Sequence, residues 1–307
     1  MRRIEKPAHT GGLGHQLLLV WAKHEGLILV GLAALALIFP MIFSHPYIMN
    51  IAVLAVIYAI LTVSLNLLTG CLGIASIGHA AFMALGAYTA ALLVLRLGCG
   101  FLTAFVAAIG VTAVFGLILA IPTLRLNSRY LTIVTLAFSE LVRIVLTNWT
   151  SLTRGPLGLP AIPSISIFGV PLDSGIPNYY FGLILLAATI IVVHNIMNSG
   201  VGRAVTAIKN DPVAAETMGI KVHWYKLLIF AVSSVFAGLA GAFYAFYIGF
   251  IDPSGFSFDT SVQILSMAIM GGLGNTYGSV LSAIVLTALP EVLRPLLSLR
   301  QVLYGAL

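Results

Sequence analysis

Three ionisable side chains lie inside long apolar runs of this sequence, where a charge is costly. His79 follows a glycine-rich stretch, and Glu140 and Arg143 lie three residues apart in the run TLAFSELVRIVLTN (135–148). At that spacing, Glu140 and Arg143 share one face of a helix. Such groups in a membrane form proton relays, gates or ion pairs that fix packing. We expect a buried ion pair between Glu140 and Arg143, with a structural role favoured over a gate.

The apolar run that contains His79 is also broken by small residues, and we predict that Gly73, Ser76, Gly78 and His79 line a translocation pathway. Irregular backbone persists in a membrane only where it is buried in protein or lines a water-filled cavity. Close helix packing through small residues is the alternative for the glycines. For His79, the alternative is a neutral side chain hydrogen-bonded to a neighbouring carbonyl. A second glycine-rich run, GGLGNTYG (271–278), suggests an internal repeat.

A long polar stretch, VGRAVTAIKNDPVAAETMGIKVHWYK (201–226), separates two apolar runs. Asp211 is a good N-cap, Pro212 suits the first helical position, and Gly219 suits the left-handed position after a helix. The pattern predicts a helix of about two turns from Pro212 to Met218. One side of it is suited to enter a groove on another protein, with Glu216 near the edge.

Several kinds of chemistry are excluded by the motifs. No lysine is followed by Ser or Thr, so a phosphate-binding loop of the GxxxxGK[ST] type is absent, and neither a nucleophile elbow nor HExxH occurs. We therefore expect a chain that is not an enzyme, has no catalytic residues and needs no cofactor. Cys71 and Cys99 flank the third apolar run, and a helix joining them would be about 42 Å long, so we expect free thiols and no metal site.

The composition assigns the chain to the membrane proteins. Of 307 residues, 60% are hydrophobic and 8% charged, whereas soluble domains have about 25% charged residues. We predict an all-α, polytopic transmembrane bundle of about nine or ten spans. The predicted spans are 26–43, 48–68, 74–95, 101–121, 131–148, 179–197, 227–250, 260–274 and 278–290, with Leu296–Leu307 as a possible beginning of another.

The basic residues indicate the orientation of these spans. Two of them, Arg96 and Arg154, fall in the segments expected outside. The segments expected inside hold ten: Arg2, Arg3, Lys6, Lys23, Arg125, Arg129, Arg203, Lys209, Lys221 and Lys226. This bias predicts a cytoplasmic N-terminus, and the charge of +6 reports orientation in lipid, not nucleic-acid binding.

We divide the chain accordingly. Residues 1–25 are expected to be a cytoplasmic segment and residues 26–307 a membrane domain. Within that domain we expect an external loop at 149–178 and a cytoplasmic loop at 198–226. The first apolar run lacks a small-residue cleavage site, so we expect it to remain as the first helix.

Four separated runs resemble the branched-chain amino acid permease family of ABC importers, and they cover most of the chain from about residue 48. They are LNLLTGCLGIASIGHAAFMALGAYTAALL (65–93), TLAFSELVRIVLTNWTSLTRGPLGLPAIP (135–163), GRAVTAIKNDPVAAETMGI (202–220) and AGLAGAFYAFYIGFIDPSGFSF (237–258). The last run, with MGGLGNTYGSVLSA (270–283), is more similar to the M-type subunit than to its H-type partner. The family pattern also implies a final helix and short tail where this chain stops.

The resemblance implies a subunit in a bacterial inner membrane that works with an H-type permease, two ABC ATPases and an extracytoplasmic substrate-binding protein. The helix from Pro212 then becomes the element that couples to an ATPase, with Asp211, Pro212, Ala215, Glu216 and Gly219 as its site residues. Residues 150–178, with Asp252–Asp259, offer a surface for the binding protein.

Two other function classes stay open from the residues alone. An ion-coupled secondary transporter would use His79, Glu140 and Arg143, but it gives the capped polar helix no role. A channel or permease for urea, short amides or other small acids would explain the glycines. Branched-chain amino acids are the substrates that the resemblance favours.

Overall fold

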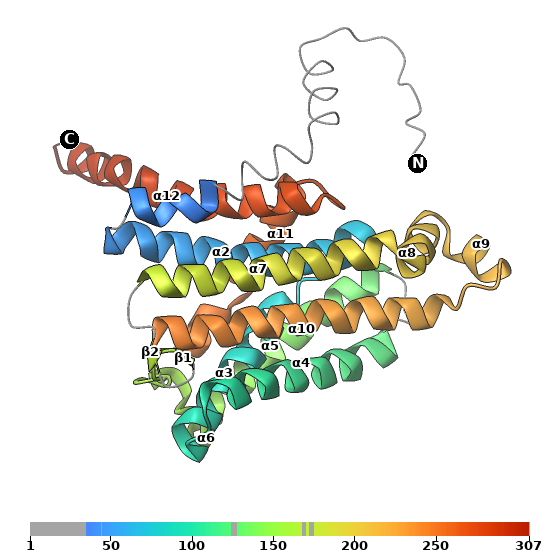
Figure 1. Cartoon of the computed structure of the whole chain (residues 1–307), viewed down its shortest axis with the longest axis horizontal. Helices are drawn as coiled ribbons and strands as arrows, with labels where there is room; N and C mark the ends of the chain where they lie inside the picture. The colour runs from blue at the N-terminus through green and yellow to red at the C-terminus, as the bar shows by residue number, and fades with distance from the viewer. Residues whose placement is uncertain (1–34, 44, 124–127, 168–169, 172–174, 307) are drawn as a thin grey trace, which may run out of the picture. The chain divides into compact units, whose positions relative to one another are not determined.

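The computed structural model describes residues 35–43, 45–123, 128–167, 170–171 and 175–306, which are almost entirely helical (Figure 1). The chain divides into two compact units, Met1–His45 and Pro46–Leu307. In the first unit residues 35–42 are helical. The predicted N-terminal segment and the first part of the predicted span 26–43 lie outside the described residues.

The second unit contains the remaining elements. In chain order they are α2 (Pro46–Asn66), the π-helical turn η1 (Leu67–Cys71), α3 (His79–Leu97), α4 (Phe101–Thr123), α5 (Ser128–Asn148), α6 (Thr150–Thr153), η2 (Gly155–Leu157), β1 (Ser166–Ile167), β2 (Val170–Pro171), α7 (Gly175–Asn198), α8 (Gly200–Asn210), α9 (Pro212–Thr217), α10 (Val222–Ile248), η3 (Pro253–Phe256), α11 (Phe258–Met270) and α12 (Thr276–Ala306).

Six helices in the described part of the chain are long and apolar enough to cross a membrane. They are Pro46–Cys71, His79–Leu97, Phe101–Pro122, Tyr130–Asn148, Gly175–Asn198 and Val222–Ile248. Each overlaps a predicted span, and the prediction of a multi-pass helical bundle is confirmed. Helices of this length satisfy their backbone groups internally, as hydrocarbon requires.

The predicted boundaries differ from the observed ones in three places. The third predicted span begins at His79 and not at residue 74, because residues 72–78 are not helical. The span predicted at 260–274 is the 13-residue helix α11, about 20 Å long and so shorter than the hydrocarbon layer. The separate span suggested from Leu296 is wrong, because α12 continues unbroken from Thr276 to Ala306.

Helix α10 is the centre of the bundle and packs against α3, α4 and α2. Glycines allow this close approach, since a Cβ on Gly86 of α3 would lie 2.6 Å from the Cα of Gly238, and one on Gly241 would lie 2.7 Å from the carbonyl carbon of Met83. Phenylalanines fill the space between α4, α7 and α10, where Phe101 lies 4.8 Å from Phe246, ring centre to ring centre. Small residues therefore set the helix spacing, as is usual in membranes.

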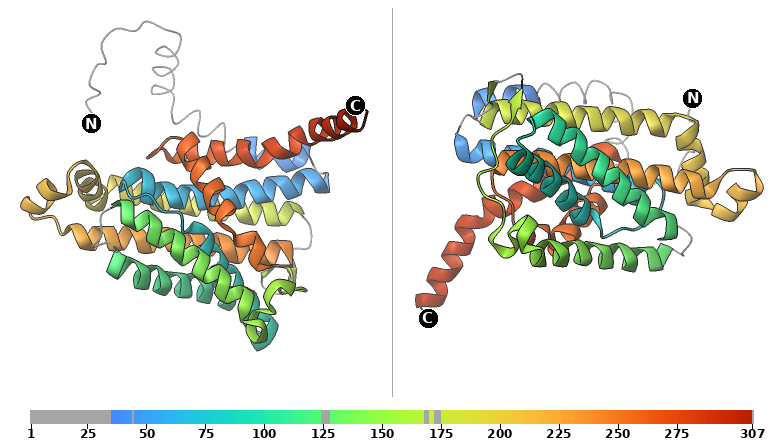
Figure 2. Two further views of the ribbon diagram at one scale, coloured as in Figure 1. Left: turned by 180° about the vertical axis from the view of Figure 1, so that it is seen from behind. Right: turned by 90° about the horizontal axis from the view of Figure 1, so that it is seen from below.

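The two long polar connections of the second unit lie at opposite ends of the bundle (Figures 1 and 2). Helices α8 and α9, between α7 and α10, extend beyond one end. At the other end, Tyr247 Oη of α10 donates to Asn50 Oδ1 of α2 at 3.1 Å. Which end faces the cytoplasm stays a prediction.

The connection between α5 and α7 contains α6, η2 and a short antiparallel hairpin in which Ser166 pairs with Pro171 and Ile167 with Val170. Leu159 forms an isolated bridge with Ile251, and its N–H donates to the Ile251 carbonyl at 2.8 Å. This bridge joins the connection to the segment between α10 and α11. The two segments expected to receive a binding protein are thus side by side.

Candidate functional site

The polar connection between α7 and α10 folds into two capped helices. Ser199 caps α8 by accepting from the Val201 N–H at 3.1 Å. Asp211 ends α8 and begins α9, and its Oδ1 accepts from the N–H groups of Val213 at 2.9 Å and Ala214 at 3.0 Å. The predicted N-cap is confirmed, and Pro212 occupies the first turn of α9 as expected.

The end of α9 also follows the predicted pattern. Gly219 has φ +82°, and nothing lies within 4 Å of the position that a Cβ would take. The Ile220 N–H donates to the Ala215 carbonyl at 3.1 Å, which closes the C-terminal turn. Glycine is therefore favoured at position 219 because of the left-handed backbone conformation, and not because a larger side chain would collide with its neighbours.

The side chains of α9 and of Met218, the residue that caps its C-terminal end, divide into two sets. Val213 is 71% exposed and Met218 83% exposed, and Glu216 is exposed beside them. Ala215 is only 4% exposed, so it packs against its own chain and does not offer its side chain to a partner. Val213 and Met218 supply the apolar surface of the tip.

The seven residues 72–78, between η1 and α3, form a break in the membrane part of the bundle. Helix α5 holds this first break in place: Thr132 Oγ1 donates to the Ala75 carbonyl at 3.0 Å, and Thr135 Oγ1 accepts from the Ile77 N–H at 3.1 Å. Gly78 packs on the same turn, since a Cβ there would lie 3.1 Å from the Thr135 carbonyl oxygen. Threonine hydroxyls thus replace helical hydrogen bonds that the break lacks.

Burial alternates along this first break. The even-numbered residues, Leu72, Ile74, Ser76 and Gly78, are buried. The odd-numbered ones, Gly73, Ala75 and Ile77, are partly or fully exposed, as is Cys71 just before the break. Of the predicted pathway residues, only Gly73 is on the open side, with φ +77°.

His79 is 1% exposed and is enclosed by its own chain. Its Nε2 lies 3.0 Å from Ser233 Oγ, and Ser233 Oγ donates to the Ser64 carbonyl at 2.6 Å. Because the single hydroxyl proton of Ser233 is used there, His79 Nε2 must carry a proton and act as the donor. The imidazole links α3 to α10 and α2, with a serine between it and the carbonyl.

A second break, residues 271–275, separates α11 from α12, and Asn66 of α2 holds it. Asn66 Nδ2 donates to the Asn275 carbonyl at 3.0 Å and to Ser279 Oγ at 2.8 Å, and Asn66 Oδ1 accepts from the Gly274 N–H at 2.8 Å. Sequence reasoning missed Asn66. The signal was present, because an amide inside an apolar run must find partners.

The second break touches η1, the turn that comes immediately before the first break. A Cβ on Gly274 would lie 3.5 Å from the Gly70 carbonyl oxygen, and one on Gly70 would collide with the Gly274 nitrogen. The two runs suspected of forming a repeat are therefore neighbours, and the glycines permit backbone-to-backbone contact. Lys209 of α8 reaches the same place, since its Nζ donates to the Gly70 carbonyl at 2.6 Å.

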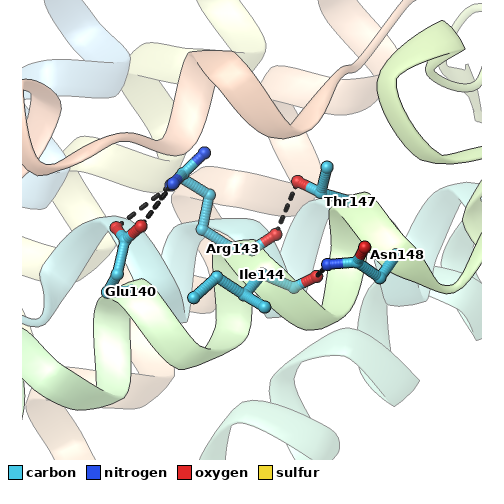
Figure 3. A network of polar contacts seen from close by, with 5 residues as sticks. All are labelled: Glu140, Arg143, Ile144, Thr147 and Asn148. Carbon is cyan, nitrogen blue, oxygen red and sulfur yellow. Dashed lines mark hydrogen bonds and ion pairs between the residues drawn. The ribbon is translucent and has the colours of Figure 1, made fainter.

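Glu140 and Arg143 form an ion pair on α5, with Arg143 Nε at 3.0 Å from both carboxylate oxygens of Glu140 (Figure 3). Their side chains are 35% (Arg143) and 41% (Glu140) exposed. The expectation of a buried pair is wrong within this chain, because the pair lies on an outward side of α5. Among the described residues, no hydrogen bond joins this pair to His79, so the three groups do not form one relay.

The cysteines and metal-binding residue types add no site in the part of the chain that the structure describes. Cys71 and Cys99 are free thiols. Within those residues, no group of three His, Cys, Asp or Glu side chains is placed to hold a metal ion.

The chain is similar in sequence to known membrane transport proteins. Residues 47–307 match the family described as branched-chain amino acid transport system / permease component. The chain is 34% identical to the high-affinity branched-chain amino acid transport system permease protein LivM of Escherichia coli (strain K12), over 92% of this chain and 72% of that protein. It is 24% identical to the corresponding LivH protein of the same strain, over 75% of this chain and 79% of that protein. No solved structure matches the chain.

The expected resemblance to the M-type subunit is confirmed, because the identity to LivM exceeds that to LivH and covers more of the chain. The family match includes both breaks, the ion pair and the α8–α9 connection. This chain, a multi-pass membrane protein, belongs to the family of permease components of branched-chain amino acid transport systems.

Proposed function

We propose that this chain is the M-type permease subunit of an ATP-driven ABC importer in a bacterial inner membrane and that it carries branched-chain amino acids. It forms the pathway together with an H-type permease. Two ATPase subunits hydrolyse ATP, and an extracytoplasmic binding protein delivers the substrate. The family match and the identity to LivM support the substrate class.

The observation that carries the proposal is the α8–α9 connection. A capped helix with two exposed apolar side chains, Val213 and Met218, extends beyond the bundle. Exposed apolar groups on a short helix are suited to a groove on a partner protein. A secondary carrier or a passive channel has no partner ATPase, so it would give this exposed helix no role.

Two further features support a permease partner. The Glu140–Arg143 pair is on an outward side of α5, where lipid would be an unfavourable neighbour for charge. The open side of the first break, at Gly73, Ala75 and Ile77, is likewise incomplete without a facing surface. Contact with a second permease at these two places would shield the charges and complete the break.

The proposed topology has nine spans with a cytoplasmic N-terminus. The six apolar helices account for six, α11 together with the second break (residues 271–275) adds one, α12 adds one, and the predicted span 26–43 supplies the first. The α8–α9 end then faces the cytoplasm, in agreement with the positive charge of Arg203, Lys209, Lys221 and Lys226. Segment 1–25 is cytoplasmic and loop 149–178 external in this scheme.

Disulfide trapping in the reconstituted complex tests the proposal. In a chain without Cys71 and Cys99, a cysteine at Met218 should cross-link to a cysteine in the groove of the partner ATPase. A cysteine at Ala215 is the matched control, because this position is buried against its own chain and should not react. Absence of the Met218 cross-link, together with leucine uptake that does not depend on ATP, would reject the importer in favour of a carrier or channel.

A further inference from the structure

Lys209 joins helix α8, in the polar segment between α7 and α10, to the membrane part of the bundle. Its ammonium group donates to the Gly70 carbonyl at 2.6 Å, although the two residues are 139 positions apart in the chain. Gly70 is in η1, the last turn before the first break. Carbonyls at a helix C-terminus lack a following turn to bond with, and a cation there is favoured by the helix dipole. The contact is thus a charged cap on the end of η1, the turn that continues α2.

Both breaks lie next to the hydrogen bond between Lys209 and the Gly70 carbonyl. Gly274 of the second break packs on Gly70, and Gly73 of the first break packs on the Lys209 stem, since its Cβ would lie 3.3 Å from Lys209 Cγ. A shift of Gly70 by a fraction of an ångström would therefore be felt by both segments. π-helical turns such as η1 often occur at functional sites.

On the side of Lys209 away from Gly70, Asp211 joins α8 to α9 through defined hydrogen bonds. Asp211, two residues after Lys209, caps α9 through two backbone N–H groups. Its own N–H donates to the Ala207 carbonyl of α8 at 3.1 Å. Because α8 and α9 share this residue, a force on α9 reaches Lys209 through only a few covalent and hydrogen bonds.

We propose that Lys209 is a positioning residue that transmits movement of the ATPase-docked helix α9, through α8, to the two glycine-rich breaks by way of the Gly70 carbonyl. This inference rests on the proposed importer function and deepens it. Docking at α9 moves α8, the Lys209 ammonium pulls on or releases Gly70, and the breaks change their spacing. Lys209 itself does not touch the substrate.

The chain supplies its own reporter for this movement. Cys71 is adjacent to Gly70 and partly exposed, and Cys99 can be removed by Cys99→Ser. The experiment measures the rate at which N-ethylmaleimide labels Cys71 in the complete reconstituted complex, without nucleotide and with ATP plus vanadate. Leucine uptake per ATP hydrolysed is measured in parallel.

The unmodified lysine should give labelling rates that differ between the two nucleotide states. Lys209→Met should abolish that difference and lower uptake per ATP by roughly 5- to 150-fold, the usual range for coupling between two sites. ATP hydrolysis should continue. Lys209→Arg, which keeps the charge, should restore part of the difference.

Arg203→Met is the matched control, because Arg203 is an exposed cation on the same helix and should behave as the unmodified chain. If Lys209→Met does not fold, Lys209→Gln keeps a donor while removing the charge and should show the same loss in weaker form. Unchanged coupling and unchanged nucleotide dependence in these Lys209 variants would overturn the inference. Equal changes of the labelling rate in both nucleotide states, with normal uptake per ATP, would also overturn it, because a purely structural cap predicts that result.

The Met218 cross-link separates this inference from the proposed function. If the cross-link forms and the Lys209 variants are normal, only the role of Lys209 is wrong. If the cross-link does not form and uptake is independent of ATP, the importer itself is wrong.

Discussion

Replacing Gly86 by alanine tests the close contact between α3 and α10, on which the position of His79 and the first break depends. The added Cβ would lie 2.6 Å from the Gly238 Cα, whereas carbon atoms in contact prefer about 3.5–4.0 Å. The helices must therefore separate by about 1 Å. Forcing extra atoms into a packed core costs about 1–3 kcal/mol, so we expect Gly86→Ala to lower the free energy of unfolding by that amount.

Gly110 offers a control with the same chemical change. It is on α4, is exposed, and has nothing within 4 Å of a Cβ. Glycine is a poor helix former, so Gly110→Ala should be neutral or stabilise the protein by at most about 1 kcal/mol.

The assay is the thermal unfolding midpoint of the purified chain in one detergent. With about 2–4 °C per kcal/mol, Gly86→Ala should lower the midpoint by about 2–12 °C. Gly110→Ala should leave it unchanged or raise it by up to about 4 °C. Shifts of the same sign and size in both variants would refute the reasoning, because they would show that the contact with Gly238 does not affect the free energy of unfolding.

Three other predictions concern the site. Asn66→Leu should lower the unfolding free energy by about 2–4 kcal/mol, since it removes the acceptor of the part-buried Gly274 N–H and the hydrogen bonds that Asn66 donates to Asn275 and Ser279. Asn148→Leu is the control, because the Asn148 amide donates to the Ile144 carbonyl of its own helix, and it should lower the unfolding free energy by less than about 0.5 kcal/mol. Equal losses for the two variants in thermal unfolding would contradict this account. In intact cells an impermeant maleimide should label Cys99 and not Cys71, because they lie at opposite ends of the bundle, and the reverse pattern would invert the topology. Gly219→Val should strain the turn after α9 by about 1–2 kcal/mol and lower uptake per ATP, while Gly219→Asn should be tolerated; equal uptake in both would show that the left-handed turn is unimportant.

Local sequence patterns were sufficient to predict those features of the structure that depend on interactions between residues close together in the chain. Asp211, Pro212 and Gly219 act on backbone groups within a few residues, so their caps could be predicted from their order along the chain. The six apolar spans followed from hydropathy, because a membrane requires long helical runs whatever their neighbours are. The four runs resembling the permease family predicted the family that the comparisons then showed.

The tertiary structure decided what depends on distant partners. Asn66 meets residues more than 200 positions away, and Lys209 meets Gly70 across 139. No pattern within one helix could indicate that Ala215 is buried or that the Glu140–Arg143 pair faces outward, since burial is set by which helices pack together. The two glycine runs could be recognised in the sequence, but their contact through Gly70 and Gly274 exists only because α2, α11 and α12 are folded side by side.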